Sequence, residues 1–221
     1  MGKKIIAIDG PAGAGKSTVA QIVAQRLYYT YIDTGAMYRA MAWKVQHDGL
    51  TVQDISGIIN IAHSITIKLT YIEGLTKVFV DEKDVTAEIR DPSISGIVSD
   101  IAQVAAVREA MVSLQQLMAK PGGVVMDGRD IGTHVLPNAD LKIFLTASIE
   151  ERAQRRWREL TDKGFVVSLA DISRDIGTRD KKDCERLISP LIQAPDAILL
   201  DTTGLSIEQA VSTILKICEE R

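Results

Sequence analysis

The sequence predicts an α/β fold in which helices cover a parallel central sheet. Short apolar runs recur along the 221-residue chain, and longer stretches with helical spacing separate them. The first apolar run leads directly into a glycine-rich loop, which a helical pattern follows. Short apolar strands that alternate with helices are typical of a parallel sheet buried on both faces.

The N-terminal elements are marked by a switch from an apolar run to helical spacing. Residues 3–8 read KKIIAI, and glycines interrupt the chain before the next apolar pattern begins. The pair Thr34-Gly35 closes the following short run. We therefore expect a strand over residues 3–8, a helix over Lys16–Leu27, a strand at Tyr31 and Ile32, and a helix over 36–47.

The later elements repeat the alternation. The run 123–126 ends in Asp127, the segment 141–145 reads LKIFL, and 197–200 reads AILL before Asp201. Helical spacing appears between and after these runs. We expect strands at 123–126, 141–145 and 197–200, and helices at 149–160 and 206–218.

One segment departs from this rhythm and predicts a small antiparallel meander over Ser64–Ile89. Apolar residues alternate with polar ones on either side of short polar turns, a pattern that antiparallel strands show. The alternating residues are Ile65, Ile67 and Leu69, then Val78 and Val80 after a turn at Glu73-Gly74, and Val85 after Lys83-Asp84.

The segment Asp162–Lys182 is rich in Asp, Lys and Arg and contains Gly164 and Gly177. Two interpretations stay open for it. It forms either a mobile flap or a polar surface helix with loops.

Composition excludes several classes of protein. With 46% hydrophobic and 25% charged residues the chain can bury a full core, so disorder and collagen-like structure are excluded. The 26 Lys+Arg against 29 Asp+Glu give a net charge of −3, which argues against wrapping of DNA or RNA. Any anion must therefore meet a local positive site.

Cysteine usage and hydropathy bear on location. Cys184 and Cys218 form no CxxC pair and are too few for a disulfide framework, so a reducing interior is expected. The longest apolar runs are well short of about 18 residues, and Met1–Ile8 has no signal-peptide core. We expect a cytoplasmic protein that does not bind membranes.

The local positive site is predicted by residues Gly10–Ser17. They spell GPAGAGKS, a full match to G-x-x-x-x-G-K-[ST], with a strand before and a helix after. Glycines let backbone N–H groups face phosphate oxygens, Lys16 neutralises the β- and γ-phosphates, and the Ser17 hydroxyl can ligate Mg²⁺. The fold class predicted is thus a P-loop NTPase-type three-layer fold.

This loop predicts nucleotide binding but does not distinguish switch GTPases, motor ATPases and small-molecule kinases. The guanine-reading tetrapeptide Asn-Lys-x-Asp is absent, because Asn60 and Asn138 are followed by Ile61 and Ala139. A GTPase switch therefore loses its main support.

Arginines and one aspartate point to phosphoryl transfer. Arginine binds phosphate through a planar fork and stays charged, and several arginines lie near the ends of expected elements: Arg39, Arg108, Arg129, Arg179 and Arg186. Each alone is also compatible with a solvated surface residue. Asp127 closes an apolar strand, where a carboxylate needs a metal or hydrogen bonds; it fits an acid that orients Mg²⁺ through water, or a simple strand-end cap.

These residues carry a resemblance to the bacterial cytidylate kinases, which covers essentially the whole chain. The matching segments are Ile8–Pro11 through Lys16-Ser17, Asp33–Arg39, Val107–Glu109, Asp127–Thr133, Lys142–Leu145, Glu151–Ala153, Arg155-Arg156, Arg179-Asp180-x-x-Asp183-x-x-Arg186, Pro190-Leu191 and Asp201–Thr203. The family transfers the γ-phosphoryl of ATP to CMP or dCMP, giving CDP or dCDP.

The resemblance implies a role for each matching site residue. ATP is expected at Gly10, Pro11, Ala12, Gly13, Ala14, Gly15, Lys16, Ser17 and Thr18, and CMP at Thr34, Arg39, Ser99, Arg108, Arg129, Asp130, Arg179, Asp183 and Arg186. Arg39, Arg129 and Arg186 hold the acceptor phosphate, Arg179 and Asp183 contact the ribose, and Ser99, Arg108 and Asp130 read the cytosine. Catalysis is assigned to Lys16, Asp127, Arg129 and Arg186, and Mg²⁺ to Ser17 directly and Asp127 through water.

The resemblance also implies one kinase domain over residues 1–221. Its core covers about 1–35, 91–154 and 183–221, a monophosphate-binding insert about 36–90, and a helical lid about 155–182. Thr34 stands where serine is frequent among relatives, which keeps the hydroxyl. Lysine replaces arginine at some lid positions, so Arg152, Arg156, Arg158 and Lys182 all stay open as the cation that contacts the transferring phosphoryl.

Two rival functions remain at this stage. A kinase for another acceptor, such as AMP, UMP or shikimate, shares the loop but does not account for Asp127–Asp130 and the meander. An ATP-dependent interaction module would need a partner surface, of which the sequence gives no sign. We expect ATP and CMP or dCMP as partners, no nucleic-acid polymer, and a monomer, since heptads are lacking.

Overall fold

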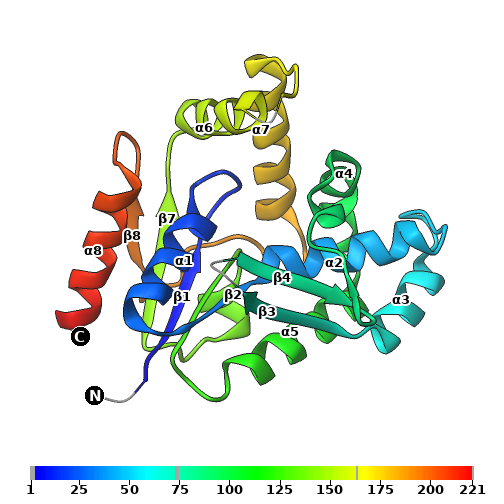
Figure 1. Cartoon of the computed structure of the whole chain (residues 1–221), viewed down its shortest axis with the longest axis horizontal. Coiled ribbons are helices and arrows are strands. Elements are labelled where there is room, and N and C mark those ends of the chain that lie inside the picture. The colour runs from blue at the N-terminus through cyan, green and yellow to red at the C-terminus, as the bar shows by residue number, and fades with distance from the viewer. Residues whose placement is uncertain (1–2, 73–74, 163, 221) are drawn as a thin grey trace. The chain divides into compact units, whose positions relative to one another are not determined.

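The chain folds into two compact units in a computed structural model that describes residues 3–72, 75–162 and 164–220 (Figure 1). The first, called here the sheet unit, comprises residues 1–31 and 122–221. The second, called the middle unit, is Ile32–Pro121. In this division, residues 91–121 group with the middle unit and residues 155–182 with the sheet unit.

The central sheet has five strands in the order β2-β6-β1-β7-β8. Strand β1 pairs in parallel with β6 and β7, and β7 pairs in parallel with β8. The strands are β1 (Ile5–Asp9), β2 (Thr30–Asp33), β6 (Val124–Gly128), β7 (Leu141–Thr146) and β8 (Ile198–Asp201). The expected parallel α/β sheet is confirmed, with strand ends within about two residues of those predicted.

Two helices, α1 (Lys16–Leu27) and α8 (Ile207–Glu220), share one apolar core with the sheet. Ile6 and Ile8 of β1 contribute to this core, together with Val23 of α1 and Ile214 of α8, and Figure 1 shows the two helices side by side. Each such buried side chain stabilises the fold by about 1.5–3 kcal/mol. Ala7 and Met126, which face the opposite side of the sheet, are also fully buried, so both faces are covered.

The glycine-rich loop is held tightly against the sheet at Gly10. Its φ is +147°, and a Cβ at this position would lie 1.9 Å from the carbonyl oxygen of Leu145 in β7. Only glycine fits this combination of backbone angle and close approach. The strand, loop and helix that the phosphate-binding motif requires are thereby placed as predicted.

Gly10→Ala is expected to lower the free energy of unfolding by about 3 kcal/mol, because backbone strain and a steric clash act together. Urea denaturation measures this change. Gly204→Ala is the matched control, since Gly204 also has a positive φ of +74° but a Cβ added there would meet no atom within 4 Å. Equal losses for the two variants would contradict the packing argument.

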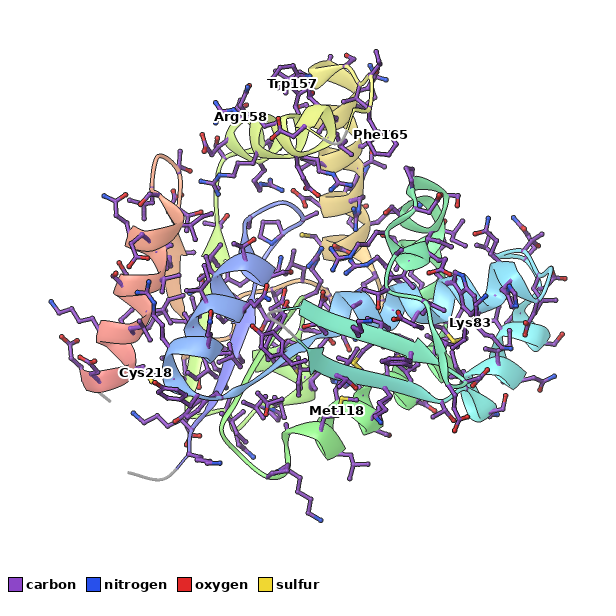
Figure 2. All side chains as sticks on the ribbon, viewed as in Figure 1. Lys83, Met118, Trp157, Arg158, Phe165 and Cys218 are labelled. Atoms are coloured by element: carbon purple, nitrogen blue, oxygen red, sulfur yellow. The ribbon has the colours of Figure 1, made fainter. Side chains whose placement is uncertain are left out.

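Two helices, α6 (Ile149–Asp162) and α7 (Leu169–Glu185), form a helical hairpin in the sheet unit (Figure 1). Ala153, Ile172 and Ile176 form a small core between them, against which Trp157 packs. The Trp157 Nε1–H donates to the carbonyl oxygen of Val167 at 3.2 Å. Figure 2 shows Trp157, Arg158 and Phe165 at the outer end of this hairpin. Of the two interpretations of segment 162–182, the polar helix is the one observed over most of its length.

The middle unit consists of helices and a three-stranded antiparallel sheet in the order β3-β4-β5. Ile67 pairs with Val80 and Leu69 with Val78, so the meander is confirmed, although its first strand begins at Ile67 because Ile65 caps the preceding helix. The turn expected at Glu73-Gly74 lies outside the described residues. The elements are α2 (Thr34–His47), α3 (Ile55–Ser64), β3 (Ile67–Ile72), β4 (Leu75–Val80), β5 (Lys83–Asp84), η1 (Glu88–Arg90), α4 (Pro92–Ile101) and α5 (Ala105–Ala119).

None of the helices in the described parts of the chain combines the length and the apolar character that crossing a bilayer requires.

Candidate active site

The loop Gly10–Ser17 joins β1 to α1 and has the backbone form that a phosphate cradle needs. Gly13 and Gly15 have φ of +75° and +88°, the left-handed conformation that glycine adopts without strain. Lys16 opens α1 and is 5% exposed. Its Nζ donates to the carbonyl oxygen of Pro11 at 2.7 Å, so the side chain folds back over the loop.

The charge of Lys16 is costly in the absence of an anion. Burial and, to a smaller extent, the Arg129 guanidinium lower its pKa from 10.5 to about 7, although Asp127, Asp9 and Asp183 oppose this decrease. A bound phosphate would favour the charged form. The loop is therefore a site at which an anionic ligand and a buried cation stabilise one another.

Asp127 receives two hydroxyl hydrogen bonds. Ser17 Oγ donates to one carboxylate oxygen at 2.9 Å, and Tyr31 Oη donates to the other at 2.8 Å. Asp127 is 3% exposed, so the carboxylate is fixed in orientation. Carboxylate and hydroxyl oxygens suit Mg²⁺, and the observed pair fits the ion. Within the described ranges 3–72, 75–162 and 164–220, no group of three or more His, Cys, Asp or Glu side chains offers another metal site.

Tyr31 was not predicted as a site residue. Its hydroxyl reaches Asp127 because β2 and β6 are neighbours in the sheet. The available signal was a tyrosine within a predicted strand, because a partly buried phenol O–H usually finds a hydrogen-bond partner.

Two arginine–aspartate ion pairs are formed by residues that lie outside the strands of the central sheet. Arg129 Nε lies 2.8 Å from Asp183 Oδ2, and Arg186 Nη2 lies 3.3 Å from Asp130 Oδ1. The Arg186 and Asp130 side chains are only 7% and 6% exposed. The alternative interpretation of Arg186 as a solvated surface residue is therefore wrong.

The pKa values of the first pair follow from its geometry. Burial works to raise the pKa of Asp183, but Arg129, Arg186 and Arg179 outweigh it and hold the pKa below its usual value. Burial works to lower the pKa of Arg129, but Asp183 and other carboxylates keep it above its usual value. Both groups are thus charged at neutral pH.

Asp9, at the end of β1, anchors the turn that follows Arg129 and Asp130 in the chain. Its two carboxylate oxygens accept from the backbone N–H groups of Ile131 and Gly132 at 2.8 and 2.7 Å. These residues open η2 (Ile131–Val135), immediately after Arg129 and Asp130. Asp9 had been assigned no role from the sequence, since a hydrogen bond across 122 positions leaves no local pattern.

Burial and, to a smaller extent, Asp130 raise the pKa of Asp9 from 3.8 to about 6, although the two N–H donors and Lys16 oppose this rise. Because the folded-state pKa lies above the unfolded value, the stabilisation from this group is complete below about pH 3.8 and is lost as pH rises through about 6. The free-energy difference between wild type and Asp9→Asn should therefore fall by about 2 kcal/mol between pH 4 and pH 7.5. Urea denaturation across this range measures it, and a constant difference would refute it.

The middle unit carries four of the predicted site residues. Asp33 caps α2 by accepting from the Ala36 N–H at 2.8 Å, and its other oxygen lies 3.3 Å from Arg39 Nη2. One carboxylate thus starts the helix and orients Arg39. Thr34, the first residue of α2, is buried.

The other two lie on the later helices of the same unit. Ser99 is on α4, and Arg108 is on the first turn of α5 and only 2% exposed. The Arg108 guanidinium lies 5.7 Å from the centre of the Tyr38 ring, a cation–π contact. A buried guanidinium held in this way is pre-oriented for a ligand.

The predicted residues therefore divide between the two units. In the sheet unit they are Gly10–Thr18, Asp127, Arg129, Asp130, Arg179, Asp183 and Arg186. In the middle unit they are Thr34, Arg39, Ser99 and Arg108. The ligand roles of these residues stay predictions.

The four lid cations left open by the sequence differ in their surroundings. Arg152 is 4% exposed and donates to the carbonyl oxygens of Ala147 and Ala12 at 2.9 and 2.8 Å. Arg156 pairs with Glu159 at 2.8 Å on the surface of α6. Arg158 and Lys182 are exposed. Arg152 is thus bound into the fold, whereas the other three stay open for the transferring phosphoryl.

Comparison with known proteins extends this description. The sequence model of the family described as "Cytidylate kinase" matches residues 6–220. A protein named "Cytidylate kinase" from Desulfitobacterium hafniense (strain Y51) is 54% identical over 98% of this chain and 93% of its own length. One of the same name from Caldicellulosiruptor bescii is 50% identical over 97% and 96%.

A crystal structure of an uncharacterized protein from Eubacterium ventriosum resembles this chain in fold. The TM-score is 0.55 at 13% identity, and the match covers 99% of this chain and 100% of the other. At this identity the likeness concerns the fold alone.

Proposed function

Because the chain belongs to the cytidylate kinase family, we propose that it phosphorylates CMP and dCMP to CDP and dCDP by direct in-line transfer of the γ-phosphoryl group of ATP. The observation that carries this proposal is the family match over residues 6–220. The glycine-rich loop and its buried lysine supply the chemistry that such a transfer needs.

ATP binds at the loop between β1 and α1 in this proposal. The backbone N–H groups of this loop and Lys16 neutralise the phosphates of ATP, and the N-terminus of α1 adds its partial positive charge. The residues assigned to ATP are Gly10, Pro11, Ala12, Gly13, Ala14, Gly15, Lys16, Ser17 and Thr18.

Mg²⁺ accompanies ATP and is held by Ser17 Oγ directly and by Asp127 through water. The ion, when bound, neutralises charge on the β- and γ-phosphates. Tyr31 supports this site from the opposite side of Asp127, since its hydroxyl donates to Oδ1. The Asp127 carboxylate is thereby held toward Ser17 before any ligand arrives.

The acceptor phosphate is held by Arg39, Arg129 and Arg186. Each has a carboxylate partner at 3.3 Å or less, which fixes the guanidinium and limits the entropy lost on binding. The resemblance assigns Thr34 to the same phosphate, and Arg179 and Asp183 to the ribose. These groups hold the attacking oxygen in line with the γ-phosphorus, so no covalent enzyme intermediate is needed.

Cytosine is read by Ser99, Arg108 and Asp130. Cytosine presents an N4 amino donor beside N3 and O2 acceptors, so carboxylate or hydroxyl oxygens accept from N4 while Arg108 donates to N3 or O2. Uracil presents the opposite pattern at positions 4 and 3. Buried groups left unpaired reject such an analogue by up to about 10⁴-fold.

Segment 155–182 serves as a lid that excludes water, the competing acceptor. Its support is the α6–α7 hairpin, which packs through a small core of its own. The core at 1–35, 91–154 and 183–221 and the insert at 36–90 complete the proposed organisation. Both cysteines are free thiols, which supports a reducing, cytoplasmic setting; that the chain acts as a monomer stays a prediction.

One experiment tests the proposed function. ADP formation from ATP and Mg²⁺ is measured in parallel with CMP, dCMP, UMP, AMP, shikimate and no acceptor. We expect rapid turnover with CMP and dCMP only. Faster turnover with another acceptor would assign a different kinase activity, and hydrolysis without an acceptor would favour an ATP-dependent interaction module.

A further inference from the structure

The backbone of Ala12, in the phosphate loop, is hydrogen-bonded to the α6–α7 hairpin through both its N–H and its carbonyl oxygen. Its carbonyl oxygen accepts from Arg152 Nη1 of α6 at 2.8 Å. Its N–H donates to Asp180 Oδ1 of α7 at 3.3 Å. The same Arg152 Nη1 lies 2.7 Å from Asp180 Oδ2. The three groups therefore close a ring of polar contacts around one residue of the loop.

Both side chains are fixed by their surroundings. The Arg152 side chain is 5% exposed and the Asp180 side chain 18%. The Nε of Arg152 also donates to the carbonyl oxygen of Ala147, at 2.9 Å, in the segment that joins β7 to α6. The guanidinium thus connects the end of the central sheet, the phosphate loop and α7.

Packing at the next residue supports the same connection. A Cβ on Gly13 would lie 3.3 Å from the Cβ of Arg152 and 3.8 Å from Cδ1 of Ile176. Ile176 belongs to the small core between α6 and α7. The hairpin therefore lies close to the loop at two successive residues, with polar contacts at Ala12 and little space for a side chain at Gly13.

We propose that Arg152 and Asp180 are positioning residues that clamp the Ala12 backbone and hold the phosphate loop in the shape that receives the ATP phosphates. The inference rests on the proposed function, in which ATP is the phosphoryl donor. Arg152 acts through the loop backbone and does not touch the transferring phosphoryl. This leaves Arg156, Arg158 and Lys182 as the possible lid cations.

The same contacts are also compatible with an inhibitory role for Asp180. The test must therefore distinguish a clamp that helps ATP to bind from a carboxylate that competes with ATP. A carboxylate on a loop N–H resembles a phosphate oxygen, so Asp180 would then compete with ATP and keep the loop inhibited. The clamp predicts that removal of Asp180 weakens ATP binding. Competition predicts that removal strengthens it.

The test measures the Kd for ATP by calorimetry without CMP, alongside the KM for CMP. For Arg152→Met and Asp180→Ala we expect the Kd for ATP to rise about 10- to 100-fold, as for loss of a charged hydrogen bond, and the KM for CMP to change less than about 3-fold. Arg174→Met is the control, because Arg174 forms an ion pair with Asp171 on the exposed surface of α7; it should bind ATP as wild type does.

Milder variants keep the test valid if the first ones fold poorly. Asp180→Asn keeps an oxygen for the Ala12 N–H but loses the ion pair, and Arg152→Lys keeps the charge but cannot span both carbonyl oxygens. Each should raise the Kd by about 3- to 10-fold. Amide hydrogen exchange at Ala12, followed by NMR without ligand, should be faster in Asp180→Ala.

Unchanged or tighter ATP binding by the folded variants would overturn the clamp. A lowered melting temperature with an unchanged Kd would show a purely structural role and would also overturn it. Because the Kd is measured without an acceptor, it does not depend on CMP being the substrate. If wild type binds ATP but does not phosphorylate CMP, the proposed acceptor fails while the clamp can still be judged.

Discussion

Lys16→Met is expected to lower kcat/KM for ATP by about 10³-fold or more. Methionine keeps the volume of the buried side chain but removes the charge aimed at the phosphates, and loss of one preorganised electrostatic group typically costs about 10²–10³-fold or more. The variant also loses the hydrogen bond from Nζ to the Pro11 carbonyl oxygen. Steady-state kinetics at varied ATP and saturating CMP measures the effect.

Lys4→Met is the matched control for this variant. Lys4 Nζ also donates to a backbone carbonyl oxygen, that of Cys218, at 2.7 Å, but it precedes β1 whereas the phosphate loop follows it. Lys4→Met should lower the stability of the protein and leave kcat/KM within about 3-fold of wild type, because it removes only a side-chain hydrogen bond of a lysine. A similar loss in both variants would contradict the role of Lys16.

Arg108→Met is expected to lower kcat/KM for CMP by about 10³-fold while the Kd for ATP changes less than about 3-fold. The guanidinium is buried and held over the Tyr38 ring, so its loss leaves base acceptors unpaired in a dry site. Kinetics at varied CMP, with calorimetry for ATP, separates the two substrates. Equal losses for CMP and ATP would exclude the base-reading role.

Two further variants refine this result. Arg108→Lys keeps the charge but not the planar fork, so we expect it to recover only part of the activity. Arg90→Met removes an exposed arginine of η1 in the same unit and should behave as wild type. A full recovery in Arg108→Lys would show that charge alone is needed.

The sequence predicted the elements whose signals are local. The helix expected over Lys16–Leu27 is observed with the same bounds, because Gly15 precedes it and Tyr28, with φ of +56°, ends it. For the polar helix α7, the sequence could not decide between a mobile flap and a surface helix. Its buried apolar residues are few, and their packing partner Trp157 lies on another helix.

The sequence predicted most of the residues of the site but not the hydrogen bonds that connect them. Lys16, Ser17, Asp127 and the arginines were identified from a motif and a resemblance. Asp9 and Tyr31 were missed, because their hydrogen bonds reach across 122 and 96 positions and exist only once the strands have paired. Likewise, no sequence pattern shows that Asp180 reaches the Ala12 N–H.

The register of β1 against β6, in which Ile8 faces Asp127 and Asp9 faces Gly128, limits how this site can be redesigned. Side chains alternate between the two faces of a strand, so a slip by one residue would turn Asp127 away from Ser17 and present Met126 in its place. A single-residue insertion within Val124–Gly128 would disconnect the acid from the phosphate loop while leaving the composition of the core almost unchanged.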